Sequence, residues 1–123
     1  MSSIVYVHSG GVNNPERSAT PIYLATTAAA MDVEVGIYFT VNGPTLLKKG
    51  VAETLIVPKY DGNGAPLRRF IDQALDMGVK FYVCQPSLDL HGLTRDDLID
   101  EVQMIGGAAF NDMCLEADAV ISF

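Results

Sequence analysis

Short apolar runs that alternate with helix-favouring segments constrain the fold of this chain more than any other feature. Three runs have the length and β-branched or aromatic content of buried strands, namely Ile4–His8, Val33–Thr40 and Val79–Cys84. The sequence "AVISF" at residues 119–123 has the same character. Strands that alternate with helices at this spacing are typical of an α/β domain with a largely parallel sheet. No linker, internal repeat or low-complexity stretch divides the chain, so we predict one domain over residues 1–123.

The clearest predicted helix begins at Leu67 and ends before Gly78, which is typical of the residue that follows a helix. Its apolar face repeats at helical spacing and consists of Leu67, Phe70, Ile71, Ala74 and Leu75. An earlier helix extends to Met31 and contains Pro21. The proline either kinks this helix or marks a separate start that Thr20 caps.

Three other segments are predicted from weaker patterns. Glu53–Val57 has the composition of a strand, although a proline soon follows it. The Thr94-x-x-Asp97 pattern is a capping box, and it predicts a helix with Leu98, Ile99 and Val102 on one face. The "MIGG" sequence after it indicates a break or a short strand, and Ala108–Ala117 is predicted to be helical.

Composition and charge exclude several classes of function. Apolar residues make up 49% of the chain and charged residues 19%, which is typical of a globular protein. No apolar run is long enough to span a membrane, and the start "MSSIVYVHSGG" is not typical of a signal peptide, so we expect a cytoplasmic protein. The net charge is −7, with only the pairs Lys48–Lys49 and Arg68–Arg69 approaching a basic cluster. Nucleic acid and anionic membrane surfaces are therefore not expected partners.

The chemistry is expected where the strands end, because ligands of parallel α/β sheets bind outside the carboxyl ends of the strands. Three segments leave such ends: "HSGGVNN", "FTVNGP" and "CQPSLDLHG". If their strands are neighbours, the three segments form one rim with Cys84 on its inner edge. The predicted site therefore centres on Cys84.

Two interpretations of Cys84 are open from the residues alone. Backbone N–H groups of a glycine-rich turn would lower the pKa of the thiol, Ser87 would donate a hydrogen bond, and His91 would carry a proton if the loop folds back. The carboxylate of Asp89 and those of residues 96 and 97 would raise the pKa if they lay close. Alternatively, Cys84 is simply the last buried residue of a strand, since cysteine is among the most buried residue types.

Other candidate groups favour structural roles. Cys114 lies on the apolar stripe of a predicted helix, with a minor role as a resolving thiol left open. His8 ends the first strand and could face Cys84 across the rim, but no local spacing of ligands indicates a metal site. The "SGGVNNPE" segment could hold a small anion through backbone N–H groups, although a tight turn is favoured because neither dinucleotide nor P-loop spacing is present.

The ordered series of segments resembles the DsrE/DsrF/TusD-like proteins over nearly the whole chain. The series consists of "SGGVNNPERSATPIYLATTAAAMDVEVGIYFT", "GVKFYVCQPSLDLHGLTRDDLI", "GGAAF" and "ADAVISF". Its most telling part is C-x-x-S-x-x-x-x-G, formed by Cys84, Ser87 and Gly92. The stretch after Cys84 is more similar to stand-alone members than to relay subunits.

The resemblance implies a three-layer α/β/α sandwich around a mostly parallel sheet of about five strands. It also implies a homo-oligomer, such as a trimer or hexamer, and a partner such as a TusA-like carrier or a rhodanese-like donor. In relay members the cysteine matching Cys84 accepts sulfane sulfur as a persulfide and passes it to a partner thiol. Some members lack this cysteine.

The leading hypothesis is therefore a sulfur carrier or sulfurtransferase-like protein that needs no cofactor or metal. Cys84 holds the sulfur, and the backbone N–H groups of Gly10, Gly11 and Gln85, together with Ser87, stabilise the anionic terminal sulfur. His91 moves the proton. Two alternatives stay open: a non-enzymatic, oligomeric binding module with a structural Cys84, and a peroxide-reactive thiol protein.

Overall fold

The centre of the molecule is a five-stranded sheet in the order β6-β5-β2-β1-β7. The computed structural model describes all residues from 1 to 123. The strands of the sheet are β1 (Ser3–His8), β2 (Glu34–Phe39), β5 (Lys80–Val83), β6 (Val102–Met104) and β7 (Ala119–Ser122). Every neighbouring pair is parallel, which confirms the predicted α/β class and its parallel sheet.

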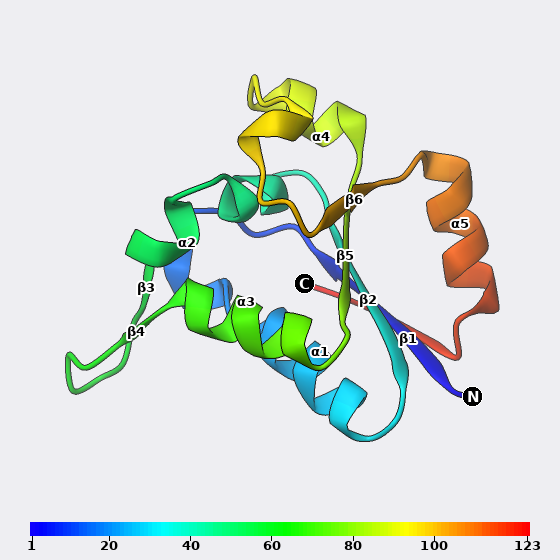
Figure 1. Cartoon of the computed structure of the whole chain (residues 1–123), viewed down its shortest axis with the longest axis horizontal. Coiled ribbons are helices and arrows are strands. Elements are labelled where there is room, and N and C mark those ends of the chain that lie inside the picture. Colours follow the sequence, from blue (N-terminus) through cyan, green and yellow to red (C-terminus); the bar gives the residue numbers. More distant parts are fainter.

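Helices lie on both faces of the sheet (Figure 1). They are α1 (Thr20–Ala30), α2 (Val51–Thr54), α3 (Leu67–Asp76), α4 (Gln85–Leu90) and α5 (Gly107–Glu116). Helices α1 and α3 cover one face, α5 stands alone on the other, and α4 lies at the carboxyl end of β5 (Figure 1). Two short strands, β3 (Ile56–Val57) and β4 (Ala65–Pro66), form a separate antiparallel pair. None of the helices has the length and apolar character that crossing a membrane requires.

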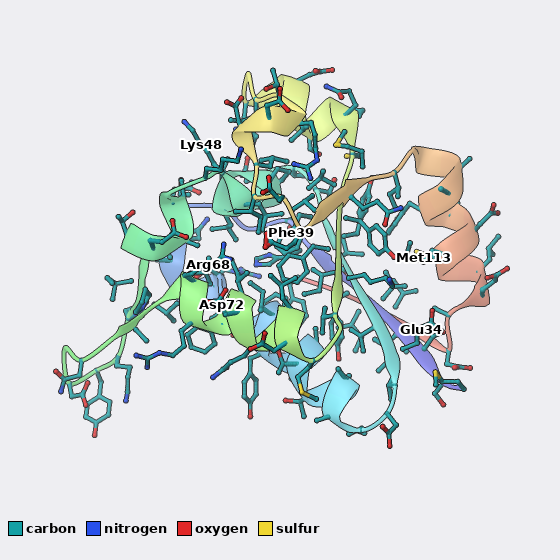
Figure 2. All side chains as sticks on the ribbon, viewed as in Figure 1. Glu34, Phe39, Lys48, Arg68, Asp72 and Met113 are labelled. Atoms are coloured by element: carbon teal, nitrogen blue, oxygen red, sulfur yellow. The ribbon has the colours of Figure 1, made fainter.

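The alternation of side chains along β2 separates the two faces of the sheet. Val35, Ile37 and Phe39 are buried in the core that α1 and α3 cover. Tyr38 points to the opposite face, where its ring stacks on that of Phe110 in α5 with 3.9 Å between centroids. Figure 2 shows the same division, with Phe39 in the packed centre and Met113, a residue of α5, on the other side. A residue on β2 therefore belongs either to the core or to the α5 side.

The α5 side of the sheet is thinly covered. Helix α5 contains no buried residue, whereas α1 and α3 contain several. On β7, the apolar Val120, which pairs with Val5 of β1, is exposed on this side. The main core consequently lies on the other side, between the sheet and the pair α1 and α3.

Most of the predicted elements are present, and the alternative at Pro21 is resolved. The segment Pro15–Arg17 is a separate 3-10 helix, and helix α1 begins at Thr20 with Pro21 in its first turn. The expected cap by Thr20 is wrong, because Ala19 is the N-cap residue and no side chain caps the helix. The capping box of Thr94 and Asp97 is also confirmed. These agreements follow from local chemistry, since proline in a first turn and a reciprocal cap act within a few residues.

The helix predicted after this capping box is wrong. Only a 3-10 segment, Arg95–Asp97, follows Thr94, and Val102 begins strand β6. The guanidinium group of Arg95 donates hydrogen bonds to the carbonyl oxygens of Ile99, Asp100 and Val102 at 2.7–3.1 Å. An intrahelical ladder would consume these carbonyls, so the arginine stabilises an irregular segment instead.

Two other predictions need correction. The predicted strand Glu53–Val57 is shorter than expected: its first two residues end α2, Leu55 is extended, and only Ile56–Val57 pair as strand β3. The polar loop predicted after Cys84 is helix α4. Pro86 explains this second difference, because proline is favoured in the first turn of a helix, where its missing N–H costs nothing.

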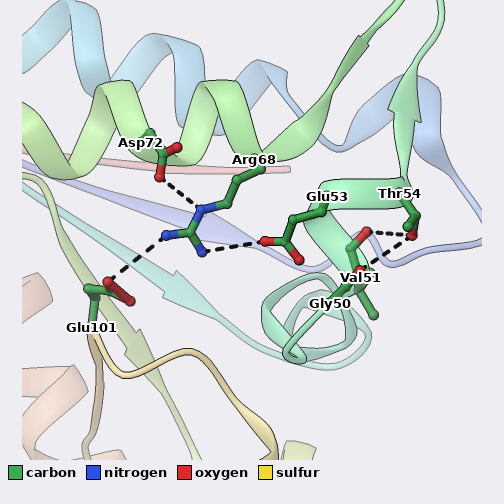
Figure 3. A network of polar contacts seen from close by, with 7 residues as sticks. All are labelled: Gly50, Val51, Glu53, Thr54, Arg68, Asp72 and Glu101. Carbon is green, nitrogen blue, oxygen red and sulfur yellow. Dashed lines mark hydrogen bonds and ion pairs between the residues drawn. The ribbon is translucent and has the colours of Figure 1, made fainter.

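Arg68 on α3 links two other parts of the chain through its guanidinium group (Figure 3). It lies 2.8 Å from a carboxylate oxygen of Asp72, 3.8 Å from Glu53 and 4.0 Å from Glu101.

We expect Arg68→Ala to lower the free energy of unfolding by about 1 kcal/mol, because a network of partly exposed pairs stabilises modestly. Urea unfolding at low and high salt measures this, and the effect should shrink at high salt. The matched control is Arg69→Ala, because Arg69 makes no ion pair. An equal loss in both variants would contradict the role of the network.

Candidate functional site

The three segments expected to form a rim do lie side by side. Strands β5, β2 and β1 are consecutive in the sheet, so the segments that leave their carboxyl ends are neighbours. Cys84 directly follows β5 and is the N-cap residue of α4. Its side chain is 8% exposed. The cysteine is therefore close to the surface but surrounded by protein atoms.

Two hydroxyl groups lie near the thiol, and a backbone amide orients one of them. The Sγ atom of Cys84 lies 3.1 Å from the Oγ atom of Ser87 and 3.9 Å from the Oγ1 atom of Thr40. The N–H of Val41 donates to Ser87 Oγ at 2.9 Å. Ser87 Oγ also lies 3.2 Å from Thr40 Oγ1. With the Val41 N–H and the Thr40 O–H donating to Ser87, its single O–H donates to the sulfur. The backbone of the β2 loop in this way orients Ser87 towards Cys84.

The pKa of Cys84 lies below its ordinary value. Burial alone would raise the pKa, because it disfavours the charged thiolate. Hydrogen bonds from the hydroxyl groups of Ser87, Tyr38 and Thr40, and from the backbone N–H of Ser87, favour the thiolate and outweigh burial. Thiolate is the nucleophilic form, so this environment activates the cysteine.

Tyr38 completes the donor set from the α5 side of the sheet. Burial raises the pKa of its phenol well above the ordinary value, and the negative charge of a nearby Cys84 thiolate acts in the same direction. The hydroxyl group consequently stays protonated and acts as a donor. Stacking on Phe110 holds the ring in place.

Cys84 opens onto a cavity of about 340 Å³ between α4, β6 and α5. The cavity is mostly apolar and is lined by Tyr38, Pro86, Met104, Gly106 and Gly107 in addition to Cys84. A methyl group added at either glycine would meet no atom within 4 Å, and neither glycine has a positive φ. Packing within the chain therefore does not require glycine there, and these residues leave the mouth of the cavity open.

His91 and Gln85 occupy supporting positions. The Nε2 atom of His91 lies 2.9 Å from the carbonyl oxygen of Val41, so the imidazole contacts the β2 loop rather than the sulfur. Val41 has the positive φ of 55°, which is unfavourable for a β-branched residue. The amide group of Gln85 donates to Asp89 at 2.9 Å, and Gln85 lines the Cys84 cavity. His91 and Ser87 thus hold both polar groups of the strained Val41.

The structure separates the glycine-rich turn from Cys84. Gly10 lines a different cavity together with His8 and Arg17, and a methyl group at Gly11 would lie 2.8 Å from atoms of Asn42 and Thr45. His8 does not face Cys84 either. Its Nε2 atom lies 2.8 Å from the carbonyl oxygen of Ser18, and its ring packs on Phe39, on the core face of the sheet.

Cys114 lies on α5, is partly buried and forms no disulfide. Burial raises the pKa of its thiol, so it is less ionised than Cys84 at neutral pH. No group of three or more His, Cys, Asp or Glu side chains is placed to hold a metal ion. Of the chain's two thiols, Cys84 is consequently the more nucleophilic.

Sequence reasoning found Cys84 and Ser87 but missed the other groups around the sulfur. Tyr38 and Thr40 come from the end of β2, and the cavity glycines Gly106 and Gly107 come from the start of α5. Thr40 begins the segment that leaves β2, so a sheet with β2 beside β5 would have indicated it. The contribution of Tyr38 depends on which face of β2 it occupies, which the continuously apolar strand does not reveal.

Comparison with known proteins places the chain in a family. A model of the DsrE/DsrF-like family matches residues 2–123. An uncharacterized protein of Methanocaldococcus jannaschii is 24% identical over 89% of this chain, which spans only 38% of the length of that relative. The sulfur carrier protein DsrE2 of Allochromatium vinosum is 26% identical, over 80% of this chain and 84% of its own. The crystal structure of the ychN protein from E. coli has a TM-score of 0.80 at 20% identity, covers 100% of both chains, and thus shares the fold. With the family match extending over nearly its whole length, this chain belongs to the DsrE/DsrF-like family.

Proposed function

We propose that this protein is a sulfur carrier that holds sulfane sulfur as a persulfide on Cys84 and passes it to a partner thiol. The observation that carries the proposal is a cysteine with a lowered pKa at the edge of an open, mostly apolar cavity. Membership of the DsrE/DsrF-like family supports a sulfur-relay role, and a relative named as a sulfur carrier supports it further. Cys84 is the residue through which such a role would act.

The transfer consists of two thiol exchanges with no net oxidation. The Cys84 thiolate attacks the outer sulfur of a donor persulfide, a new S–S bond forms at Sγ, and the bond within the donor breaks. The donor thiolate leaves with the electron pair. An acceptor thiolate then attacks the outer sulfur on Cys84, and Cys84 leaves as a thiolate. A low pKa favours the second step, because a more acidic thiol is a better leaving group.

The anionic outer sulfur would extend into the cavity towards donors on both sides. Ser87 and Tyr38 supply hydroxyl groups near Sγ. The first turn of α5 begins at Gly107 on the cavity wall, and the first N–H groups of a helix have no partner within it. The backbone of Gln85 lies at the start of α4 beside the sulfur. These groups stabilise the negative charge without a cofactor or metal.

In the proposed chemistry His91 positions other groups and does not transfer a proton. Its contact with the carbonyl oxygen of Val41 fixes the β2 loop, and the N–H of Val41 in turn fixes Ser87. The imidazole would therefore affect the reactivity of Cys84 indirectly. We assign the proton-holding role to Ser87 and Tyr38, whose hydroxyl groups face the sulfur.

The sulfur donor or acceptor is proposed to be a small protein thiol, such as a TusA-like carrier or a rhodanese-like donor. The net charge of −7 gives no long-range attraction for small anionic donors, so recognition must be local or mediated by a protein. The thin cover on the α5 side and the exposed Val120 and Ile121 of β7 support assembly into a homo-oligomer, such as a trimer or hexamer.

Gly107→Leu tests whether the open mouth of the cavity admits a partner. The fold should tolerate the change, because no atom lies within 4 Å of the added Cβ position. We expect sulfur loading from a persulfidated carrier protein to slow by about tenfold or more, since a misplaced attacking group loses reactivity steeply. Thermal unfolding should be unchanged, and Asn111→Leu is the control, because Asn111 is an exposed residue of α5 outside the cavity. Equal loading rates in wild type and Gly107→Leu would contradict access through this mouth.

Intact mass spectrometry of the reduced protein tests the proposed function. Exposure to polysulfide or a persulfidated carrier should add the mass of sulfur, a reductant should remove it, and Cys114→Ser should behave as wild type. No adduct with any donor, together with resistance of native Cys84 to alkylation, would favour the binding-module function. An adduct formed only with peroxide, and carrying oxygen, would favour a thiol redox protein.

A further inference from the structure

A second cavity, which is mostly polar and has a volume of about 230 Å³, lies at the carboxyl end of β1. It is lined by His8, Ser9, Gly10, Asn14, Arg17 and Asn42, with Phe123 as the only apolar wall. None of these residues lines the Cys84 cavity. The volume is below the roughly 300–1,000 Å³ that is usual for sites of drug-sized ligands, so an occupant would be small.

His8 carries an unsatisfied nitrogen at this cavity. Its side chain is 1% exposed, and its Nε2 atom contacts the carbonyl oxygen of Ser18 at 2.8 Å. A carbonyl accepts only from an N–H, so the proton of the neutral ring is on Nε2 and Nδ1 is an acceptor. Nδ1 has no hydrogen-bond partner in the chain, and it faces Gly10 at 3.9 Å from the position of an added Cβ. Buried polar atoms without a partner are rare and usually serve a purpose.

Hydrogen-bond donors also line this cavity. The guanidinium group of Arg17 makes no ion pair within the chain. The N–H of Gly10 donates no hydrogen bond within the chain, whereas the Ser9 N–H and hydroxyl are both engaged by the main-chain oxygen of Phe123, the last residue of the sequence. The cavity therefore offers the guanidinium group of Arg17 and the N–H of Gly10 as donors, and Nδ1 of His8 as a buried acceptor.

The cavity also lies where ligands of such sheets usually bind. On one side of β1 the sheet continues with β2, β5 and β6, and on the other side β1 pairs with β7. Ligands bind at the point where the strand order reverses, outside the carboxyl ends of the strands. Ser9 and Phe123 mark the carboxyl ends of β1 and β7.

We propose that this cavity binds a small protonated oxyanion of the phosphate class, with Arg17 and the Gly10 N–H on its charged oxygens and its O–H donating to His8 Nδ1. Hydrogen phosphate carries both a negative charge and an O–H near neutral pH, and phosphate monoesters, whose second pKa is about 6, carry both at mildly acid pH. Sulfate has the same shape and charge but no proton, so it leaves Nδ1 unsatisfied. A site that hydrogen-bonds a ligand hydroxyl discriminates strongly against an analogue without it. Burial lowers the pKa of His8, as does the nearby Arg17 charge, and both keep the ring neutral and Nδ1 an acceptor.

Calorimetric titration of the full chain at mildly acid pH tests this inference, with inorganic phosphate, glycerol phosphate and sulfate as probes. We expect saturable binding of phosphate or its monoester, at least about tenfold weaker binding of sulfate, and a loss of about tenfold or more in Arg17→Gln. Arg69→Gln is the control, because Arg69 is another exposed arginine that lies outside the cavity. Tighter binding of the monoester would identify an organic phosphate as the ligand, and tighter binding of phosphate the free ion.

Nitrogen NMR of the wild-type imidazoles provides a second measurement that needs no variant of the buried histidine. Phosphate should shift the Nδ1 signal of His8 and leave that of His91 unchanged. No binding at millimolar phosphate, equal affinity for sulfate, or an unchanged affinity in Arg17→Gln would overturn the inference. Because the two cavities share no residue, Cys84→Ser should bind phosphate as wild type does, and the result is independent of sulfur carriage.

Discussion

Cys84→Ser is expected to abolish sulfur loading while leaving the fold intact. Serine is nearly isosteric with cysteine, and its hydroxyl group can keep contacts with Ser87 and Thr40. It cannot form a persulfide, and its oxygen is not ionised at neutral pH. No sulfur adduct should therefore appear under conditions in which wild type is loaded fully. The free energy of unfolding should change by no more than about 1–2 kcal/mol, because the exchanged atom stays hydrogen-bonded.

Cys114→Ser is the matched control for this result, since Cys114 is the only other thiol in the chain. Its pKa is raised by burial, so it should contribute little to loading at neutral pH. Loading that persists in Cys84→Ser but disappears in Cys114→Ser would transfer the proposed role to α5. Loss of loading in both variants would indicate that the two thiols act together, which contradicts a single carrier cysteine.

Ser87→Ala is expected to slow alkylation of Cys84 at neutral pH by about tenfold, since a hydrogen bond to a charged group contributes roughly 1.5–3 kcal/mol. Among the groups that lower the pKa of Cys84, the Ser87 hydroxyl acts most strongly after the opposing effect of burial. Without it, the thiolate fraction falls. The rate of iodoacetamide modification measured against pH gives the pKa directly, and that of the variant should be higher. Thr27→Ala is a control, because its hydroxyl bonds only to its own helix.

The hydrogen bond between Ser87 and Cys84 should also change how the free energy of unfolding depends on pH. The folded state lowers the pKa of Cys84, so the thiolate is stabilised by folding. This contribution is fully present above the ordinary cysteine pKa of about 8.5 and is lost as the pH falls through the lower folded value. The stability of wild type relative to Ser87→Ala should thus increase from neutral to alkaline pH. A difference that stays constant over this range would contradict a lowered pKa.

The sequence predicted the features of the fold that depend on local patterns. The parallel sheet and helix α3 follow from hydrophobic spacing, and the start of α1 follows from Pro21 in its first turn. The segment after Thr94 was mispredicted because its carbonyl groups are satisfied by the side chain of Arg95 rather than by a helix. Such a contact competes with the helical pattern but leaves no periodic signal in the sequence.

The site was predictable in its centre and not in its surroundings. Cys84 and Ser87 lie within one turn of α4, so their spacing in the sequence implied their contact. Tyr38 and Thr40 reach the sulfur only because β2 pairs with β5, which is a tertiary property. Gly10 and Gly11 lie at the same end of the strands but follow β1, which β2 separates from β5 and Cys84. Gly10 consequently lines another cavity.

Single-turnover transfer of sulfur is the measurement that tests sulfur carriage most directly. Protein loaded with isotopically labelled sulfur on Cys84 is separated from the donor and mixed with an excess of a thiol peptide, and both products are followed by mass spectrometry. Sulfur carriage predicts that the label leaves Cys84 as a unit and appears as a persulfide on the peptide, with free Cys84 restored at the same rate. Label that stays on Cys84, or is released without reaching the acceptor thiol, would contradict it.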